Sequence, residues 1–133
     1  MTSERPAADR LERAVAAALA AGRLAIGAGI WLAPDLSARM LGFGSLDSTG
    51  LALGRIAATR DLVLGTWLIA SLGNREELRW AATAAGAADA GDVLTFALLL
   101  GRGSDLRSAG LRGLAGAAPA TAAGHWLVRR LAR

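Results

Sequence analysis

Four apolar segments, each 21 to 23 residues long, alternate with short polar links along this chain. They cover residues 11–33, 50–72, 80–101 and 108–128. About 20 apolar residues in an α-helix are enough to cross the ~30 Å hydrocarbon core of a bilayer. No run alternates β-branched and polar residues with period two, so the pattern predicts no strands. We therefore predict an all-α fold, in which a single domain forms a four-helix transmembrane bundle.

The polar links between the segments predict different local structures. In the link at 34–49, Leu36, Met40, Leu41 and Phe43 are spaced as a short amphipathic piece that would lie on the membrane interface. Charged residues at 75–79 and polar residues at 102–107 predict two turns between neighbouring segments.

A soluble four-helix bundle would have helices of similar length, but each of its helices carries a wide polar stripe. The stretches LVLGTWLIASL at 62–72 and VLTFALLLG at 93–101 have no charge on any face. The pattern therefore favours a lipid environment over water.

Six ionisable side chains interrupt the apolar segments near their centres. They are Arg23, Arg55, Arg60, Asp61, Asp89 and Asp92. Unpaired charges at mid-membrane would cost about 15 to 20 kcal/mol if each costs ~2.5 to 3.5 kcal/mol. We therefore expect them to face inward and to form ion pairs.

The depths of these residues predict which of them meet. Arg23, Arg60, Asp61 and Asp89 lie at almost one level when the segments are placed side by side. Arg55 lies roughly 9 Å toward one side, at 1.5 Å per residue, and Asp92 is displaced the same way on its antiparallel neighbour, within reach of a guanidinium. Asp89 and Asp92, three residues apart, share a helix face and can receive two different Arg side chains.

Arginine placement predicts the orientation. Eight Arg residues flank one side of the predicted bundle and four flank the other, and an excess of basic residues marks the cytoplasmic side. The larger set is Arg5, Arg10, Arg13, Arg75, Arg79, Arg129, Arg130 and Arg133, and the smaller is Arg39, Arg102, Arg107 and Arg112. We predict a multi-pass protein of a bacterial inner membrane, with both termini cytoplasmic and the lipid bilayer as its first partner.

Composition excludes several classes of function. All fifteen basic residues are Arg and the net charge is +4, but they are scattered without a clustered basic face, so we expect no nucleic-acid partner. The absence of Cys excludes disulfides, thiolate nucleophiles and sulfur-ligated metals. No nucleophile elbow, phosphate loop or dinucleotide fingerprint occurs, and we expect no cofactor.

The central charges are the candidate site. A desolvated cluster of ionisable groups can bind a polar head or move protons, and equally it can be a buried ion network that fixes helix register. On the functional interpretation Asp61, Asp89 and Asp92 are catalytic acid/base residues, and Arg23, Arg55 and Arg60 hold an oxyanion or carboxylate of the substrate.

Two further residues complete the predicted substrate site. Trp67 lies deep in the second segment, whereas the other three Trp residues lie near predicted membrane boundaries. His125, the single histidine, could relay protons at neutral pH, or could simply place its polar tip at the interface.

Asp89 and Asp92 also form a D-x-x-D motif, a spacing that can bind Mg²⁺ and a diphosphate. Hard cations require more oxygen ligands than this motif offers, so we predict no metal site.

The run GRIAATRDLVLG in the second segment and AADAGD in the third resemble small actinobacterial four-span membrane proteins of a domain-of-unknown-function family. The resemblance implies the four-span topology and no particular activity.

Together these features predict an intramembrane Arg/Asp pocket that binds a lipophilic small molecule and acts as a cofactor-free acid/base isomerase or cyclase. Two alternatives stay open. One is a small homo-oligomeric transporter whose path is lined by the same charges, and the other is a structural or accessory membrane subunit.

Overall fold

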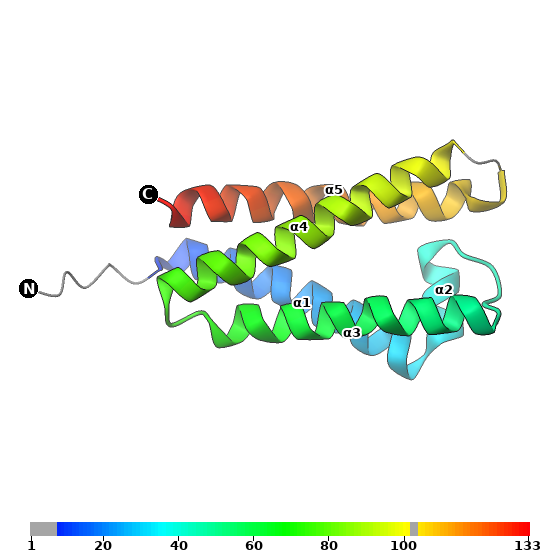
Figure 1. Cartoon of the computed structure of the whole chain (residues 1–133), viewed down its shortest axis with the longest axis horizontal. Coiled ribbons are helices and arrows are strands. Elements are labelled where there is room, and N and C mark those ends of the chain that lie inside the picture. The colour runs from blue at the N-terminus through cyan, green and yellow to red at the C-terminus, as the bar shows by residue number, and fades with distance from the viewer. Residues whose placement is uncertain (1–7, 102–103) are drawn as a thin grey trace, which may run out of the picture.

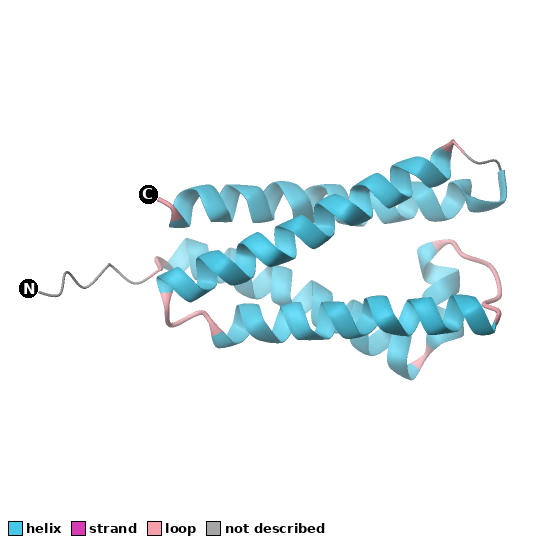
Figure 2. Cartoon of the chain, viewed as in Figure 1, coloured by secondary structure: helices cyan, strands magenta, loops and turns pink. Residues whose placement is uncertain are grey.

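The computed structural model describes residues 8–101 and 104–133, and in these ranges the chain forms five α-helices and no strand. Figure 1 shows the helices in chain order and Figure 2 shows how short the loops between them are. The helices are α1 (Arg10–Leu32), α2 (Pro34–Leu41), α3 (Ser48–Ala70), α4 (Arg75–Leu100) and α5 (Ser104–Leu131). The all-α prediction is confirmed, and the amphipathic piece predicted in the link at 34–49 is the short helix α2.

The turn predicted at 75–79 is wrong, because α4 already begins at Arg75. The Asn74 side chain caps this helix by accepting hydrogen bonds from the N–H groups of Glu76 (3.0 Å) and Glu77 (3.2 Å). Acidic residues in a first turn also interact favourably with the helix dipole. The charged residues at 75–79, which predicted a turn, therefore form the first turn of α4.

The predicted link at 102–107 is also partly helical, since α5 begins at Ser104. Residues 102 and 103 lie outside the described residues.

The four long helices form two antiparallel pairs, α1 with α3 and α4 with α5 (Figure 1). Glycines allow close approach within the α1–α3 pair. A Cβ at Gly27 would lie 2.8 Å from the carbonyl oxygen of Ala58, and a Cβ at Gly65 would lie 3.1 Å from that of Ala20. Such small residues let helix backbones come together without a bulky apolar core.

The hydrophobic core lies at one end of the bundle, where α1 begins, α3 turns into α4, and α5 ends. All four long helices contribute to it, with side chains that include Ala20, Leu68, Leu78 and Leu127. This core closes one end of the molecule, and the central charges lie next to it, farther along the helices.

At the other end α2 packs against the start of α5. Gly42 ends α2 with φ of 87°, in the left-handed region that favours glycine, and a Cβ there would lie 2.8 Å from the carbonyl carbon of Ser108. Arg112 Nη1 donates to the carbonyl oxygens of Arg39 (3.2 Å) and Met40 (2.9 Å), which lie in the last turn of α2.

Two helices of the described chain, α1 and α4, are long and apolar enough to cross a membrane. In α3, Arg55, Arg60 and Asp61 interrupt the apolar sequence. Length and composition thus support membrane spans for two of the four predicted segments.

Candidate functional site

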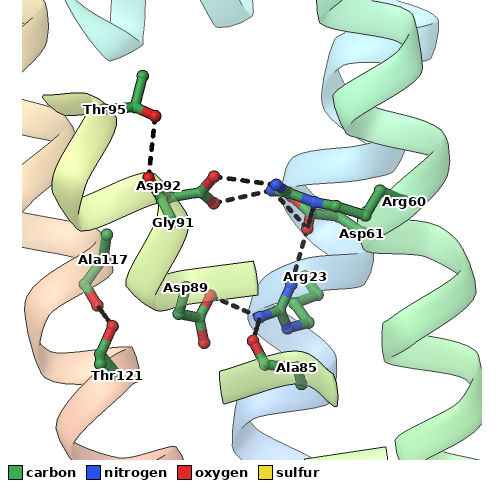
Figure 3. A network of polar contacts seen from close by, with 10 residues as sticks. All are labelled: Arg23, Arg60, Asp61, Ala85, Asp89, Gly91, Asp92, Thr95, Ala117 and Thr121. Carbon is green, nitrogen blue, oxygen red and sulfur yellow. Dashed lines mark hydrogen bonds and ion pairs between the residues drawn. The ribbon is translucent and has the colours of Figure 1, made fainter. Parts of the chain in front are cut away.

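Arg23 lies at the centre of a polar network that connects three helices (Figure 3). From α1, its Nη1 donates to Asp61 Oδ1 of α3 at 2.7 Å, and its Nη2 donates to Asp89 Oδ1 of α4 at 2.5 Å. The same Nη2 also donates to the carbonyl oxygen of Ala85, at 2.7 Å. Because the Arg23 side chain is only 7% exposed, these contacts replace most of its hydration.

Arg60 forms the second half of the network. Its Nη1 and Nη2 donate to Asp92 Oδ1 (2.9 Å) and Oδ2 (2.7 Å), a two-pronged pairing that fixes both planar groups. Its Nη2 also donates to Asp61 Oδ1 at 3.2 Å, which links this pair to Arg23. We call Arg23, Arg60, Asp61, Asp89 and Asp92 the central network.

The central network bridges the two helix pairs at mid-length. Asp89 and Asp92 lie on one face of α4 and receive different Arg side chains, as their spacing predicts. Arg23, Arg60, Asp61 and Asp89 meet, which confirms that they lie at one level. The sequence therefore predicts which elements come together here.

The predicted pairing of Arg55 with Asp92 is wrong. Both oxygens of Asp92 are occupied by Arg60, and the Arg55 guanidinium instead stacks over the Trp31 ring, 5.1 Å from its centroid. Depth along the helix gives the level of Arg55, but not the direction in which its side chain leaves α3.

Because Arg55 lies outside the network, the charges at the site do not balance. Two guanidinium groups face three carboxylates, so the central network has a formal charge of −1 when all five groups are ionised. Six central charges balance in the sequence, but the five that meet in space do not.

Two carboxylate oxygens of the network remain open. Asp61 and Asp89 accept hydrogen bonds only through Oδ1, and no described residue donates to either Oδ2. In the described part of the chain, the fully buried side-chain atoms without a partner are Arg55 Nε and Ser71 Oγ. Neither Asp61 Oδ2 nor Asp89 Oδ2 is among these fully buried atoms.

The network has a buried side and an accessible side. The side chains of Arg23, Asp61 and Asp89 are 7 to 12% exposed, whereas those of Arg60 and Asp92 are 37% and 30% exposed. A molecule approaching the network would meet the Arg60–Asp92 pair first.

The D-x-x-D motif is poorly arranged for Mg²⁺, because Arg60 occupies both oxygens of Asp92 and leaves only Asp89 Oδ2 free. Among residues 8–101 and 104–133 no three His, Cys, Asp or Glu side chains form a group suited to a metal ion.

No family model, curated protein or solved structure matches this chain. The resemblance of GRIAATRDLVLG and AADAGD to actinobacterial four-span proteins therefore stays a prediction.

Trp67 and His125 are not part of the central network. Trp67 lies nearly two turns beyond Asp61 on α3 and is 41% exposed. His125 is exposed on α5, where it lines a surface depression together with Trp126 and Arg129. Neither side chain has a polar contact with the five network residues in the described part of the chain.

A second ion cluster, which sequence reasoning missed, lies at the core end of the bundle. Glu12 Oε2 accepts from Arg75 Nη1 (2.7 Å), Asp9 Oδ2 accepts from Arg130 Nη2 (2.8 Å), and Arg75 Nη2 donates to the carbonyl oxygen of Arg130 (2.9 Å). We call Asp9, Glu12, Arg75 and Arg130 the terminal clamp.

One part of the terminal clamp has a clear sequence signal. Asp9 and Glu12 form a capping box, in which each side chain accepts a hydrogen bond from the other residue's backbone N–H. A short acidic residue followed three positions later by Glu, just before an apolar run, marks such a helix start. The backbone hydrogen bond from Glu12 lowers the pKa of the Asp9 carboxyl below its ordinary 3.8.

Proposed function

We propose that this protein crosses a bacterial inner membrane four times, with both termini in the cytoplasm. The distribution of polarity supports this proposal. Sixteen large apolar side chains are exposed in the described residues, among them Leu32, Met40 and Ile56, while Arg23, Asp61 and Asp89 are buried. Lipid stabilises such an arrangement, whereas water disfavours so much exposed apolar surface.

The apolar stretches of α1 and α4 support the same conclusion. Only 22% of the residues in the α1 stretch and 11% of those in the α4 stretch are buried, although the core helix of a soluble protein is mostly buried. In α3, Arg60 and Asp61 turn inward to the network, and Leu53, Ile56 and Val63 are left on the outer surface. We therefore propose α3 as a third span, and α5, which packs along the proposed span α4, as the fourth.

We propose that the central network is the polar end of a site for a lipophilic small molecule. The observation that carries this proposal is the unequal number of charges, three carboxylates for two guanidinium groups, with Asp61 Oδ2 and Asp89 Oδ2 unoccupied. Open carboxylate oxygens accept hydrogen bonds, so they favour a hydroxyl or ammonium group on the ligand. The guanidinium groups already have partners, and an anionic head is correspondingly disfavoured.

The same arrangement suits acid/base chemistry without a cofactor. Asp89 would take a proton from one atom of the substrate and return it to another, which is the balance that an isomerisation or cyclisation requires. Arg23 would hold Asp61 and Asp89 in position, and the Arg60–Asp92 pair would border the entrance.

The test is to purify the full chain from membranes and identify lipophilic molecules that remain bound, by mass spectrometry. Asp89→Asn keeps the side-chain shape but removes the charge, and we expect the bound molecule to be lost. Glu77→Gln is the matched control, because Glu77 is an exposed acid at the start of the same helix. Equal retention by wild type and by folded Asp89→Asn would contradict the proposal.

A small transporter is the second candidate, and the unmatched carboxylate is the observation that favours it. A proton-coupled carrier requires an acid that is free to titrate, and the central network provides one more acid than it has Arg partners. A path shared between subunits would require a homo-oligomer. Crosslinking in the native membrane that yields only monomer would exclude that form of the transporter.

A purely structural subunit makes a different prediction. Exchanging the members of the two-pronged pair, Arg60→Asp with Asp92→Arg, should then restore folding and every phenotype. A binding or catalytic site would regain its fold after the exchange and still lose its ligand.

A further inference from the structure

Arg55 is a cation within the proposed span of α3 that has no acidic partner in the described part of the chain. Its guanidinium carbon lies 5.1 Å from the centre of the Trp31 ring. Its Nε is fully buried and donates to no described atom. The Arg55 side chain as a whole is only partly buried, but a buried donor without an acceptor is costly, and an anion beside the guanidinium would lower that cost by supplying an acceptor.

The surrounding residues hold this guanidinium in place. Trp31 Nε1 donates to Thr59 Oγ1 at 3.2 Å, and Thr59 Oγ1 donates to the Arg55 carbonyl oxygen at 2.9 Å. The ring from α1 is therefore fixed against α3, and the cation–π contact restricts the Arg55 side chain. Side chains on a helix incline toward its N-terminus, which for α3 is the end of the bundle where α2 lies.

The depth of Arg55 identifies the anion, and this step rests on the proposed four-span topology. Arg55 is six residues from Asp61, or about 9 Å from mid-membrane at ~1.5 Å per residue. The edge of the hydrocarbon lies ~15 Å from the centre, so about 6 Å remains, which a long side chain can span by snorkelling. The anion found at that boundary is the phosphate of a lipid headgroup.

We propose that Arg55 and Trp31 form a binding site for the phosphate of a bilayer lipid, in the leaflet at the α2 end. Guanidinium pairs with phosphate through parallel hydrogen bonds, and Trp rings concentrate at this depth of a membrane. Arg112 lies at the same end, against the end of α2, and adds positive charge there. This site is separate from the central network and does not use its carboxylates.

Binding of phosphatidylglycerol to the delipidated full chain in detergent tests the proposal, with native mass spectrometry as the readout. We expect Arg55→Gln to weaken binding about tenfold, since a charge-assisted hydrogen bond contributes roughly that much. Arg39→Gln is the matched control, because it removes one exposed charge at the same end, and we expect a change of no more than about threefold. Thermal unfolding in the same detergent checks that each variant is folded.

Two further probes define the ligand. Diacylglycerol has the chains without the phosphate and should bind wild type as weakly as phosphatidylglycerol binds Arg55→Gln. Inorganic phosphate has no chains and should not compete. Competition by inorganic phosphate would overturn the assignment to lipid, and equal losses in Arg55→Gln and Arg39→Gln would reduce the effect to general charge attraction. If Arg55→Gln does not fold, Arg55→Lys keeps the charge without the two-pronged geometry, and binding like wild type would overturn the proposal.

A failure of the proposed lipid site can be distinguished from a failure of the proposed four-span topology. If labelling places α3 within the bilayer and Arg55→Gln binds lipid normally, only the headgroup site is wrong. If labelling places α3 in water, both proposals are wrong.

Discussion

The central network and the terminal clamp are both ion clusters between helices, but they differ in how completely their acids are used. In the terminal clamp two acids meet two Arg residues, and all four carboxylate oxygens of Asp9 and Glu12 contact a donor or a guanidinium. In the central network three acids meet two Arg residues, and Oδ2 of both Asp61 and Asp89 stays open.

This difference separates a cluster that joins helices from the cluster that we propose binds a ligand. The carboxylate oxygens of the clamp are all in use, and its contacts join α1, α4 and α5. In the central network, the open carboxylate oxygens are acceptors on buried residues. Such an oxygen is stabilised by a proton, a hydrogen-bond donor or a cation. Whether a cluster has acceptors left for a ligand is therefore indicated by its charge balance rather than by its number of ion pairs.

The largest effect is expected from Arg23→Met. The change leaves Asp61 and Asp89 without their shared cation in a buried position, which typically costs about 3 to 5 kcal/mol. Thermal or denaturant unfolding in detergent would measure the loss. Arg60→Gln is the control, since its side chain is 37% exposed and should cost much less. Equal losses of stability in the two variants would mean that the buried and the accessible halves of the network contribute alike.

A moderate effect is expected from Glu12→Gln in the terminal clamp. It removes a charge from a residue that is 2% exposed and accepts from Arg75, at a cost of about 1 to 3 kcal/mol. If the Glu12–Arg75 pair serves to join helices, the double change Glu12→Met with Arg75→Met should recover most of the stability. A double variant less stable than Glu12→Gln, or one that loses a bound ligand, would show that the clamp does more.

The smallest effect is expected from acidification at the edge of the clamp. The pKa of Asp9 is lowered on folding, so its contribution to stability is complete above its unfolded pKa and is lost as the pH falls through the folded value. We expect the protection of the first turn of α1 against hydrogen exchange, relative to the intrinsic exchange rate, to fall below about pH 4. Asp9→Asn should abolish this pH dependence, and an unchanged dependence in the variant would assign it to another group.

Periodicity and charge placement in the sequence predict the helices and most of the site. The level of Arg23, Asp61 and Asp89 and the shared face of Asp89 and Asp92 follow from counting residues along a helix. The contact of Arg55 with Trp31 does not, because depth alone does not say which way a side chain leaves its helix.

The start of α4 and the terminal clamp were missed for a related reason. Charged residues at 75–79 are typical of a turn, and only the capping by Asn74 and the partner of Arg75 identify them as a helix start. The capping box of Asp9 and Glu12 can be recognised in the sequence, but its ion pairs with Arg75 and Arg130 depend on packing between distant segments.

Cysteine labelling in intact membranes tests the central claim most directly, that lipid encloses the central network, and the absence of native Cys makes single substitutions easy to interpret. Val63→Cys and Leu94→Cys lie on outer surfaces within the proposed spans, where the native side chains are 59% and 62% exposed. The four-span account predicts that neither reacts with a membrane-impermeant maleimide until detergent is added, while Arg133→Cys reacts only in inside-out vesicles. Rapid labelling of Val63→Cys and Leu94→Cys in sealed membranes, or recovery of the protein in the aqueous fraction, would contradict the account.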